Sequence, residues 1–419
     1  MSNKSILFLS ALDFKEKSIQ VLRKTPEAYA GNGWDVDYVV SRDNSSTGSY
    51  FYEKETNLAG VKTHRFYKPL TSLQDRINNH TIKTVISKIA GFIVVLKLAY
   101  LGNKIIRSKT IDVIYGYEIH GVLAVNLLAL FGILRRVRIV SRFQGTFWYY
   151  YYCRKMYLKM LLNADHYLAL YLPSDLCIMT NDGTQGDKAL AVLGSHNLKN
   201  YRFWINGVDE QKLPQSAMGC LMQKLHAEDC EMIALTVCRL ESWKRVDRGI
   251  KAIAALRDKY EVRNFRYFIV GDGPQKEQLE ILAKTLRLSD NIVFAGAIHN
   301  EDVKKYLNIA DIVISTYDSS NVGNPLLEAI RANKIIFTLN NGDTGKWIAH
   351  KVNGFIYDPK DEDSAISDMA KDIYSLLKND TFKNVLVENV KKIEKEKLWT
   401  WRERMDSEIY EVEKLLLAR

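Results

Sequence analysis

Cysteine, proline and long apolar runs are scarce in this 419-residue sequence, and each scarcity argues against a class of protein. The five cysteines are scattered and never closer than about eight residues, so neither a disulfide framework nor a CxxC metal knuckle is expected. The apolar run at 6–9 is far too short for a signal peptide, and a reducing cytoplasm is the expected compartment. Two apolar stretches, at 89–96 and 121–134, fall short of the roughly 18 residues of a membrane span and are expected to be buried helices of a soluble core.

Length and composition predict a folded protein of two or three domains. The chain exceeds one core at roughly 150 residues per domain, and 47% hydrophobic with 26% charged residues is typical of globular proteins. Lys and Arg outnumber Asp and Glu by 59 to 49, and this formal charge of +10 suits anionic partners: nucleic acid, acidic lipid or phosphorylated small molecules. Charge alone does not choose among these three.

Short apolar runs alternate with stretches of helical period, which is typical of βαβ units in a parallel sheet. In the first half, strands are expected at 6–10, 36–40, 111–115, 138–141, 164–170 and 202–205. In the second half, they are expected at 232–237, 265–270, 291–294, 312–315, 335–338 and 354–356. A linker is expected at 206–221, where Pro, Ser and Gly cluster. The pattern predicts an α/β protein of two doubly wound domains that bind ligands in the loops after their strands.

Two loops of the second half carry groups suited to an anion. Gly271 and Gly273 follow the strand at 265–270 and allow close backbone approach before a helix begins, although a plain strand-to-helix turn has the same pattern. Arg239 and Lys244 follow the strand at 232–237, where a guanidinium and an ammonium group can converge on one diphosphate. A pair of solvated surface cations is the alternative interpretation.

A third loop follows the strand at 312–315 and leads into an apolar helix, so that its backbone N–H groups would point toward a ligand. Its donor-binding candidates are Ser320, Asn321, Val322, Gly323 and Asn324. Glu328 would lie in the first turns of that helix and could accept hydrogen bonds from ribose hydroxyls. Alternatively, it is a favourable carboxylate near a helix N-terminus, a contribution of about 0.3 to 1 kcal/mol.

The combination of these loops is more specific than any one of them. Together, four motifs resemble those of the retaining GT-B glycosyltransferases of glycosyltransferase family 4. They are NGVD at 206–209, Arg-x4-Lys at 239–244, GDGP at 271–274 and NVGNPLLEA at 321–329. The resemblance covers essentially the whole chain. It implies a Rossmann-like acceptor domain at 1–207, a Rossmann-like nucleotide-sugar domain at 208–397, and a C-terminal helix at 398–419 that returns to the first domain.

The resemblance also implies roles for the loop residues. Arg239 and Lys244 would bind the donor diphosphate, Glu328 the ribose, and the backbone at 321–324 the sugar and phosphate. The loop at 296–298, with Ile298, would border the base. Family members are drawn with the acceptor attacking the face that the diphosphate leaves, so the protein mainly orients substrates and stabilises charge. No metal is expected, because Arg239 and Lys244 would stabilise the charge on the diphosphate. No cofactor is expected, because the nucleotide sugar is itself a substrate.

Departures from the family pattern affect the sugar and acceptor contacts. The family often has a second glutamate eight positions before Glu328, where this chain has Ser320, and Asp318 is a candidate replacement. Gln144 stands where family members frequently have a histidine, and it can hydrogen-bond a sugar hydroxyl but cannot act as acid or base. His120 follows the strand at 111–115 and is the second acceptor-side candidate, although a lone histidine is more often structural.

Basic and aromatic residues are interleaved in the N-terminal half. Lysines alternate with isoleucines and valines at 82–107, and the segment at 147–162 combines Trp148 and neighbouring tyrosines with three cations. This composition suits the interface of an acidic bilayer and predicts peripheral contact with the inner face of the membrane. A core helix with a solvated basic face is the alternative, and nucleic acid is not expected as a partner because no reading module surrounds the cations.

The sequence thus predicts a cytoplasmic, metal-independent retaining transferase. Its partners would be a nucleotide-sugar donor, with UDP or GDP as the nucleotide, and a glycan or lipid-linked glycan acceptor, in cell-surface polysaccharide synthesis. Two alternatives stay open at this point: a nucleotide-sugar epimerase or hydrolase of the same fold, and a catalytically inactive GT-B binding protein.

Overall fold

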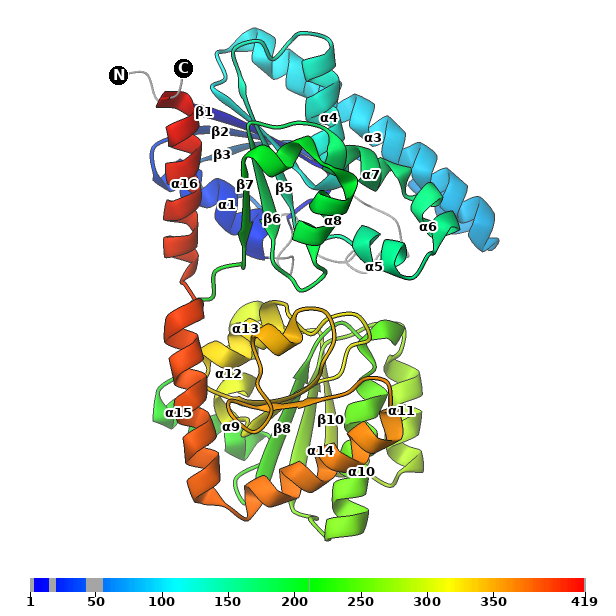
Figure 1. Ribbon diagram of the computed structural model, residues 1–419, viewed down its shortest axis with the longest axis vertical. Coiled ribbons are helices and arrows are strands. Elements are labelled where there is room, and N and C mark those ends of the chain that lie inside the picture. The colour runs from blue at the N-terminus through cyan, green and yellow to red at the C-terminus, as the bar shows by residue number, and fades with distance from the viewer. Residues whose placement is uncertain (1–3, 15–19, 43–55, 211, 418–419) are drawn as a thin grey trace. The chain divides into compact units, whose positions relative to one another are not determined.

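A computed structural model of the chain describes residues 4–14, 20–42, 56–210 and 212–417. The chain forms two compact units, each built on one sheet (Figure 1). Unit 1 consists of Met1–Asn181, Gln185–Asn206 and Trp401–Arg419, and unit 2 of Asp182–Thr184 and Gly207–Thr400. The C-terminal segment therefore belongs to the unit that contains the N-terminal strands.

Unit 1 has a seven-stranded sheet in the order β3-β2-β1-β4-β5-β6-β7, with every neighbouring pair parallel. Its strands are β1 (Ser5–Ser10), β2 (Asp35–Arg42), β3 (Val61–Tyr67), β4 (Val113–Tyr117), β5 (Arg138–Phe143), β6 (Leu176–Thr180) and β7 (Tyr201–Trp204). All six residues of β1 are buried, as expected for a central parallel strand that is covered on both faces. The strand order reverses between β1 and β4, the switch point of a doubly wound sheet.

Helices cover both faces of the unit 1 sheet. They are α1 (Gln20–Gly31), α2 (Thr71–Arg76), α3 (His80–Ser108), α4 (Glu118–Leu130), α5 (Trp148–Cys153), α6 (Tyr157–Leu162), α7 (Ala164–Tyr171), α8 (Gly186–Leu193), the 3-10 turn η1 (His196–Lys199) and α16 (Trp401–Leu417). Because side chains alternate along a strand, Phe8 packs in the core with α1 and α16, whereas Leu7 and Leu9 pack in the core with α3 and α4.

Unit 2 repeats this topology with six parallel strands in the order β10-β9-β8-β11-β12-β13. They are β8 (Met232–Val237), β9 (Phe265–Val270), β10 (Ile292–Gly296), β11 (Ile312–Ser315), β12 (Ile335–Leu339) and β13 (Phe355–Tyr357). Its helices are α9 (Gln215–Lys224), η2 (Ser242–Lys244), α10 (Val246–Tyr260), α11 (Lys276–Thr285), α12 (Asn300–Ile309), α13 (Asn324–Arg331), η3 (Thr344–Lys346), α14 (Glu362–Leu377) and α15 (Asp380–Lys397). The switch point lies between β8 and β11, and the loops after these two strands are neighbours.

One predicted strand of the first half is wrong. The stretch at 164–170 is helix α7, and the strand of this part of the chain is β6, which follows it at Leu176–Thr180. The sequence ADHYLALY contains no β-branched residue and has an aspartate in the first turn, both of which favour a helix. The edge strand β3 was also not predicted, because its alternating charged residues are only partly buried.

The expectation for the apolar stretch at 89–96 is wrong in extent. It lies inside α3, a continuous helix of 29 residues and, of the helices described, the one whose length and composition would let it cross a membrane. Only 39% of its most apolar window is buried within the protein, so α3 is not simply a core helix. The second stretch forms most of α4, whose Val122, Val125 and Leu128 are buried as expected.

Candidate functional site

The candidate donor residues gather in the loops at the carboxyl ends of the unit 2 strands. The loop after β8 is bonded on one side to the loop after β9, where Leu240 N donates to Asp272 O at 2.9 Å. On the other side it is bonded to the loop after β11, where Asp318 N donates to Trp243 O at 2.9 Å. The arrangement brings the predicted residues of all three loops into one cluster at the switch point of the sheet.

Lys244 lies at the centre of this cluster. Its Nζ is 3.9 Å from the centre of the Trp243 ring and 3.6 Å from that of the Tyr317 ring, so the ammonium group contacts an aromatic side chain of each loop. Tyr317 is buried, and its hydroxyl donates to the carbonyl oxygen of Val237 at 3.2 Å. Burial lowers the pKa of Lys244 to about 8, and a ligand that brings negative charge would raise that pKa again.

Arg239 occupies the same loop five residues earlier, and it is exposed. The backbone of its neighbour Cys238 is held against the β9 loop, where Cys238 N donates to Val270 O at 3.0 Å. Cys238 itself is buried, which raises the pKa of its thiol to about 11 and leaves it protonated at neutral pH. The loop thus presents one exposed guanidinium and one half-buried ammonium group, Arg239 and Lys244, from a fixed backbone.

The glycines of the β9 loop are required by this close packing. Gly271 has φ +137°, and a Cβ there would lie 1.8 Å from the carbonyl oxygen of Cys238. A Cβ on Gly273 would lie 2.6 Å from the carbonyl oxygen of Leu240. Any side chain at either position would therefore displace the loop that carries Arg239. The glycines fix the position of the β8 loop, whether or not their backbone also contacts a ligand.

Gly271 also connects this cluster to the β10 loop. Its N–H donates to the carbonyl oxygen of Gly296 at 2.9 Å, and the two residues form an isolated antiparallel bridge. Ile298 follows two residues after Gly296 and is half-buried. The predicted base-contacting residue therefore belongs to a loop next to that of Gly271.

Asn321 organises the loop after β11. It is buried, and its Oδ1 accepts hydrogen bonds from the Ser315 hydroxyl and the Tyr317 N–H, both at 2.9 Å. Its Nδ2 donates to Asn341 Oδ1 at 2.8 Å, and its backbone N–H donates to Thr344 Oγ1 at 3.2 Å. Because these bonds use both ends of the amide, the Asn321 side chain shapes the loop, and its predicted donor contact would come from neighbouring backbone.

Ser320 and Val322 are buried beside Asn321, and the Val322 N–H donates to Ser320 Oγ at 3.2 Å. A Cβ on Gly342, in the loop after β12, would lie 2.8 Å from Ser320 Cβ, so this position is crowded. That crowding gives a physical reason for a small residue where the family often has glutamate. Gly323 and Asn324, at the start of α13, are half-buried.

Glu328 lies on α13, one turn after the helix begins at Asn324, with Pro325 in the first turn. Burial raises the pKa of its carboxyl group to about 7, and Lys304 partly opposes that rise. The group is therefore poised to ionise near neutral pH, and donors such as ribose hydroxyls would favour the ionised form. This agrees with the predicted role without testing it.

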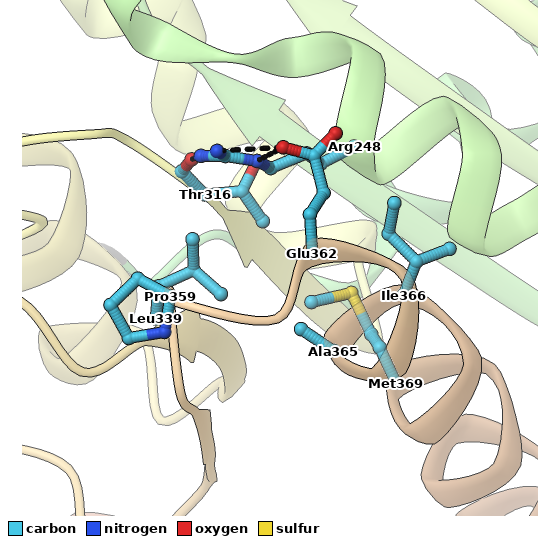
Figure 2. A pocket seen from close by; sticks show the side chains of 8 residues that line it. All are labelled: Arg248, Thr316, Leu339, Pro359, Glu362, Ala365, Ile366 and Met369. Atoms are coloured by element: carbon cyan, nitrogen blue, oxygen red, sulfur yellow. Dashed lines mark hydrogen bonds and ion pairs between the residues drawn. The ribbon is translucent and has the colours of Figure 1, made fainter.

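An ion-pair network below the β11 loop holds it in place (Figure 2). Arg248, on α10, donates through Nη1 to the carbonyl oxygen of Thr316 at 3.0 Å and through Nε to Glu362 Oε2, on α14, at 2.9 Å. Figure 2 shows Arg248, Glu362 and Thr316 beside the apolar side chains of Leu339 and Met369. The cavity that they line has room for solvent of only about 10 Å³, at the limit for one water molecule.

Asp318 is part of this network. Its Oδ1 accepts from Arg248 Nη1 at 2.7 Å and lies 3.6 Å from Arg245 Nη1. The carboxylate is thus directed toward two arginines. The structure accounts for Asp318 as an anchor of the loop, which does not favour it as a replacement for the missing family glutamate.

In unit 1, Gln144 directly follows β5 and is hydrogen-bonded to residues of the unit's interior. Its backbone N–H donates to Glu118 Oε1 at 2.6 Å, and its side-chain Oε1 accepts from Asn206 Nδ2 at 3.3 Å. Asn206 Oδ1 in turn accepts from Arg142 Nη2 at 3.2 Å. Gln144 therefore connects to the core through Asn206 and Arg142.

Glu408, on α16, is the acceptor at the centre of a buried charge cluster. Its Oε2 accepts from Arg142 Nη1 at 2.6 Å and lies 2.9 Å from Arg404 Nη1, while its Oε1 accepts from the Tyr115 hydroxyl at 2.8 Å. Arg142, Arg404 and Glu408 are fully buried. The C-terminal helix is thus attached to β4 and β5 of unit 1 by charge as well as by apolar packing.

His120 lies on α4 and faces α3. Its Nε2 is 2.6 Å from the position that a Cβ on Gly91 would take, so the absence of a side chain at Gly91 makes room for the ring. Burial lowers the pKa of His120, which keeps it neutral at pH 7. This packing against α3 accounts for the residue without a ligand, and its acceptor-side role stays a prediction.

Among the described residues, no group of three or more His, Cys, Asp or Glu side chains is placed to hold a metal ion. The cations Arg239, which is exposed, and Lys244, which is half-buried, belong to the candidate donor cluster.

A family model described as glycosyl transferases group 1 matches residues 221–393, the part of the chain that contains all of these unit 2 loops. This part of the chain thus matches the glycosyl transferases group 1 family. An uncharacterized glycosyltransferase of Methanocaldococcus jannaschii is 26% identical over 251 residues, 57% of this chain and 60% of that protein. The alpha-monoglucosyldiacylglycerol synthase of Acholeplasma laidlawii is 26% identical over 142 residues, 34% of this chain and 35% of that protein. The chain thus matches less than two thirds of the length of either curated relative.

Among solved structures, HepE of Anabaena in complex with UDP-glucose superimposes with a TM-score of 0.71 at 16% identity, covering 98% of this chain and 99% of that one. The predicted α/β fold of two doubly wound, GT-B units is confirmed.

Several residues that support the candidate donor loops were not predicted from the sequence. Trp243 and Tyr317, which contact the Lys244 ammonium, were not singled out, although both adjoin predicted site residues. Arg248 and Glu362 were missed because their pairing joins two helices more than a hundred residues apart. The sequence does show a charged residue near the start of each of these helices, α10 and α14. Such residues are too common to predict an ion pair between the helices.

Proposed function

We propose that the protein is a retaining glycosyltransferase that moves a sugar from a nucleotide donor to a glycan or lipid-linked glycan in the synthesis of cell-surface polysaccharide. The observation that carries the proposal is the Lys244 site: an ammonium group of lowered pKa, held between the β8 and β11 loops, beside exposed Arg239. A diphosphate is the ligand that this pair of cations suits best. The match of residues 221–393 to the glycosyl transferases group 1 family supports the same conclusion.

In the proposed reaction, the bond between the sugar C1 and the diphosphate oxygen breaks, and a bond from C1 to the acceptor oxygen forms on the same face. The acceptor's proton passes to the leaving diphosphate. Arg239 and Lys244 stabilise the charge that develops on that diphosphate, and ionised Glu328 holds the ribose. The chain's contribution is orientation and electrostatic stabilisation.

A UDP-sugar is the donor to test first, because the HepE structure contains UDP-glucose. A lipid-linked acceptor is supported by the name of the Acholeplasma relative, a monoglucosyldiacylglycerol synthase. We propose that acceptor binding belongs to unit 1, with Gln144 as its hydrogen-bonding candidate, and that the protein acts in the cytoplasm at the inner face of the membrane.

The test is a transfer assay with the full chain. UDP-, GDP- and ADP-glucose are each offered with two acceptors, diacylglycerol in vesicles and a polyprenyl-diphosphate-linked saccharide, and released nucleoside diphosphate is measured. NMR of the product then gives the anomeric configuration, which the proposal predicts to be that of the donor. An inverted product would contradict the retaining reaction, and Lys244→Met turning over at the wild-type rate would contradict the donor site.

A further inference from the structure

Helix α3 presents an apolar stripe to solvent. Six large side chains, spaced three or four residues apart, are exposed along one face: Ile82, Val85, Ile89, Phe92, Leu96 and Tyr100. Phe92 is 64% exposed and Tyr100 70%. The spacing places them on one side of the helix over about five turns, so they form one surface and not scattered apolar residues.

The opposite side of α3 is part of the core. Ala90, Val94 and Leu98 are buried, and Val94 and Leu98 pack in the cluster that contains Leu7 and Leu9 of the central strand β1. A helix fixed in this way along one side cannot be surrounded by lipid. Although its length and composition would permit a membrane span, the packing favours a helix that lies along a bilayer and inserts only its outer side chains.

A second apolar surface lies next to the first. On α6, Tyr157, Leu158 and Leu161 are exposed, the two leucines by 71% and 73%. Lys88, on α3 between Val85 and Ile89, donates to Asn163 Oδ1 at 3.2 Å and to Asp165 Oδ1 at 2.9 Å, at the point where α6 ends and α7 begins. Figure 1 shows α6 beside one end of α3. We call the exposed residues of the two helices, together, the amphiphilic face.

Charge around the amphiphilic face is predominantly positive, and the nearby Asp165 is paired with Lys88. Between residues 77 and 163 the sequence has thirteen Lys and Arg but only two acidic residues, Asp112 and Glu118. Neither acidic residue lies on α3, α5 or α6. Exposed cations include Lys97, Lys104 and Arg107 on α3 and Arg154, Lys155 and Lys159 around α6.

This charge distinguishes between possible occupants. A second copy of the same face would bring like charges together, which opposes self-association. An acidic bilayer offers both a complementary charge and an apolar layer for the exposed leucines and phenylalanine. Tyr100 and Tyr157 have an apolar ring with a polar tip, the combination that suits the headgroup level of a membrane.

We propose that the amphiphilic face of α3 and α6 docks unit 1 onto an acidic phospholipid surface, with α3 lying in the plane of the membrane. The inference rests on unit 1 alone and does not depend on the proposed transferase activity. A donor-site variant such as Glu328→Gln would therefore bind vesicles as the wild type does even if no sugar transfer were ever found.

The test is sedimentation of the full-length protein with vesicles of phosphatidylcholine alone or mixed with phosphatidylglycerol. We expect strong binding to the acidic vesicles, weak binding to the neutral ones, and release from the acidic vesicles by salt. Phe92→Ser combined with Leu161→Ser should lower the partition constant at least about tenfold, since each change removes apolar surface that enters the bilayer. Both positions are exposed, so circular dichroism and melting temperature should not change.

The matched control replaces one aromatic residue and one leucine of similar exposure elsewhere on unit 1. Tyr410 and Leu417, on α16, are 65% and 86% exposed. Tyr410→Ser combined with Leu417→Ser should change the partition constant by less than about twofold. Equal effects of the two double variants would overturn the proposal.

Three other results would also overturn it. The first is equal recovery of the wild type from neutral and acidic vesicles at low salt. The second is retention on vesicles through salt and alkaline washing, which would mean that α3 spans the bilayer. The third is a dimer that dissociates in Phe92→Ser/Leu161→Ser while vesicle binding is unaffected, which would assign the face to a second copy of the chain.

Discussion

Replacing Lys244 by Met should stabilise the protein while damaging donor binding. Methionine keeps an apolar chain between Trp243 and Tyr317 but removes the ammonium group that burial disfavours. Lowering the pKa from 10.5 to about 8 corresponds to a penalty of about 3 kcal/mol for the charged form below pH 8. Contact with two rings offsets about 1 to 2 kcal/mol of this, so a net stabilisation of about 1 to 2 kcal/mol is expected.

The pH dependence of this difference has a definite sign. Between the folded pKa of about 8 and the unfolded pKa of 10.5, the unfolded wild type binds more protons than the folded protein, so wild-type stability rises with pH in that window. The variant lacks this gain. The advantage of Lys244→Met should therefore shrink by about 1 to 2 kcal/mol between about pH 7 and about pH 9.5.

Urea denaturation of both proteins at the two pH values measures the effect, and donor titration measures its functional cost. Loss of one charge-assisted hydrogen bond to the diphosphate should lower donor affinity or kcat/KM roughly 10- to 150-fold. A variant that is less stable than the wild type at neutral pH, or a stability difference that does not vary with pH, would refute the interpretation of Lys244 as a desolvated cation held for a ligand.

Three further predictions concern the neighbouring structure. The pKa of Glu328, raised from 4.5 to about 7, means that wild-type stability should fall relative to Glu328→Gln between those pH values, whereas UDP affinity, measured by calorimetry, should rise through about pH 7 only in the wild type. Gly271→Ala, whose Cβ would meet a backbone oxygen, should cost more than about 2 kcal/mol in urea denaturation, against about 1 kcal/mol for Gly33→Ala, which has positive φ but open space. Glu408→Gln should cost about 3 to 5 kcal/mol, because it leaves buried arginine charge uncompensated, while Glu413→Gln, in an exposed pair, should cost less than about 1 kcal/mol.

The sequence predicted the central strands of unit 2 and the charged residues in the loops that follow them. The strands at 232–237, 265–270 and 312–315 were predicted within the bounds that the structure shows, because largely buried parallel strands are mostly apolar runs between turn residues. The loops after them follow from that assignment, so the sequence alone places Arg239 and Lys244 at one edge of a sheet.

What could not be predicted depends on contacts distant in sequence. Nothing local to Arg248 indicates that it would hold the β11 loop through Thr316, and nothing local to Glu408 indicates that it would meet Arg142. Periodicity also fails to show which side of an apolar helix is covered, since α3 is apolar nearly all round. Its exposed stripe became visible only once Val94 and Leu98 were found against β1.

The central claim is that unit 2 holds a nucleotide sugar by its diphosphate, through Arg239 and Lys244. Calorimetric titration of the full chain with UDP and with uridine isolates that contribution, because the two ligands share base and ribose. We predict that the wild type binds UDP much more tightly than uridine, and that Arg239→Gln and Lys244→Met each remove most of this difference while leaving uridine binding unchanged. An undiminished preference for UDP in both variants would contradict the account.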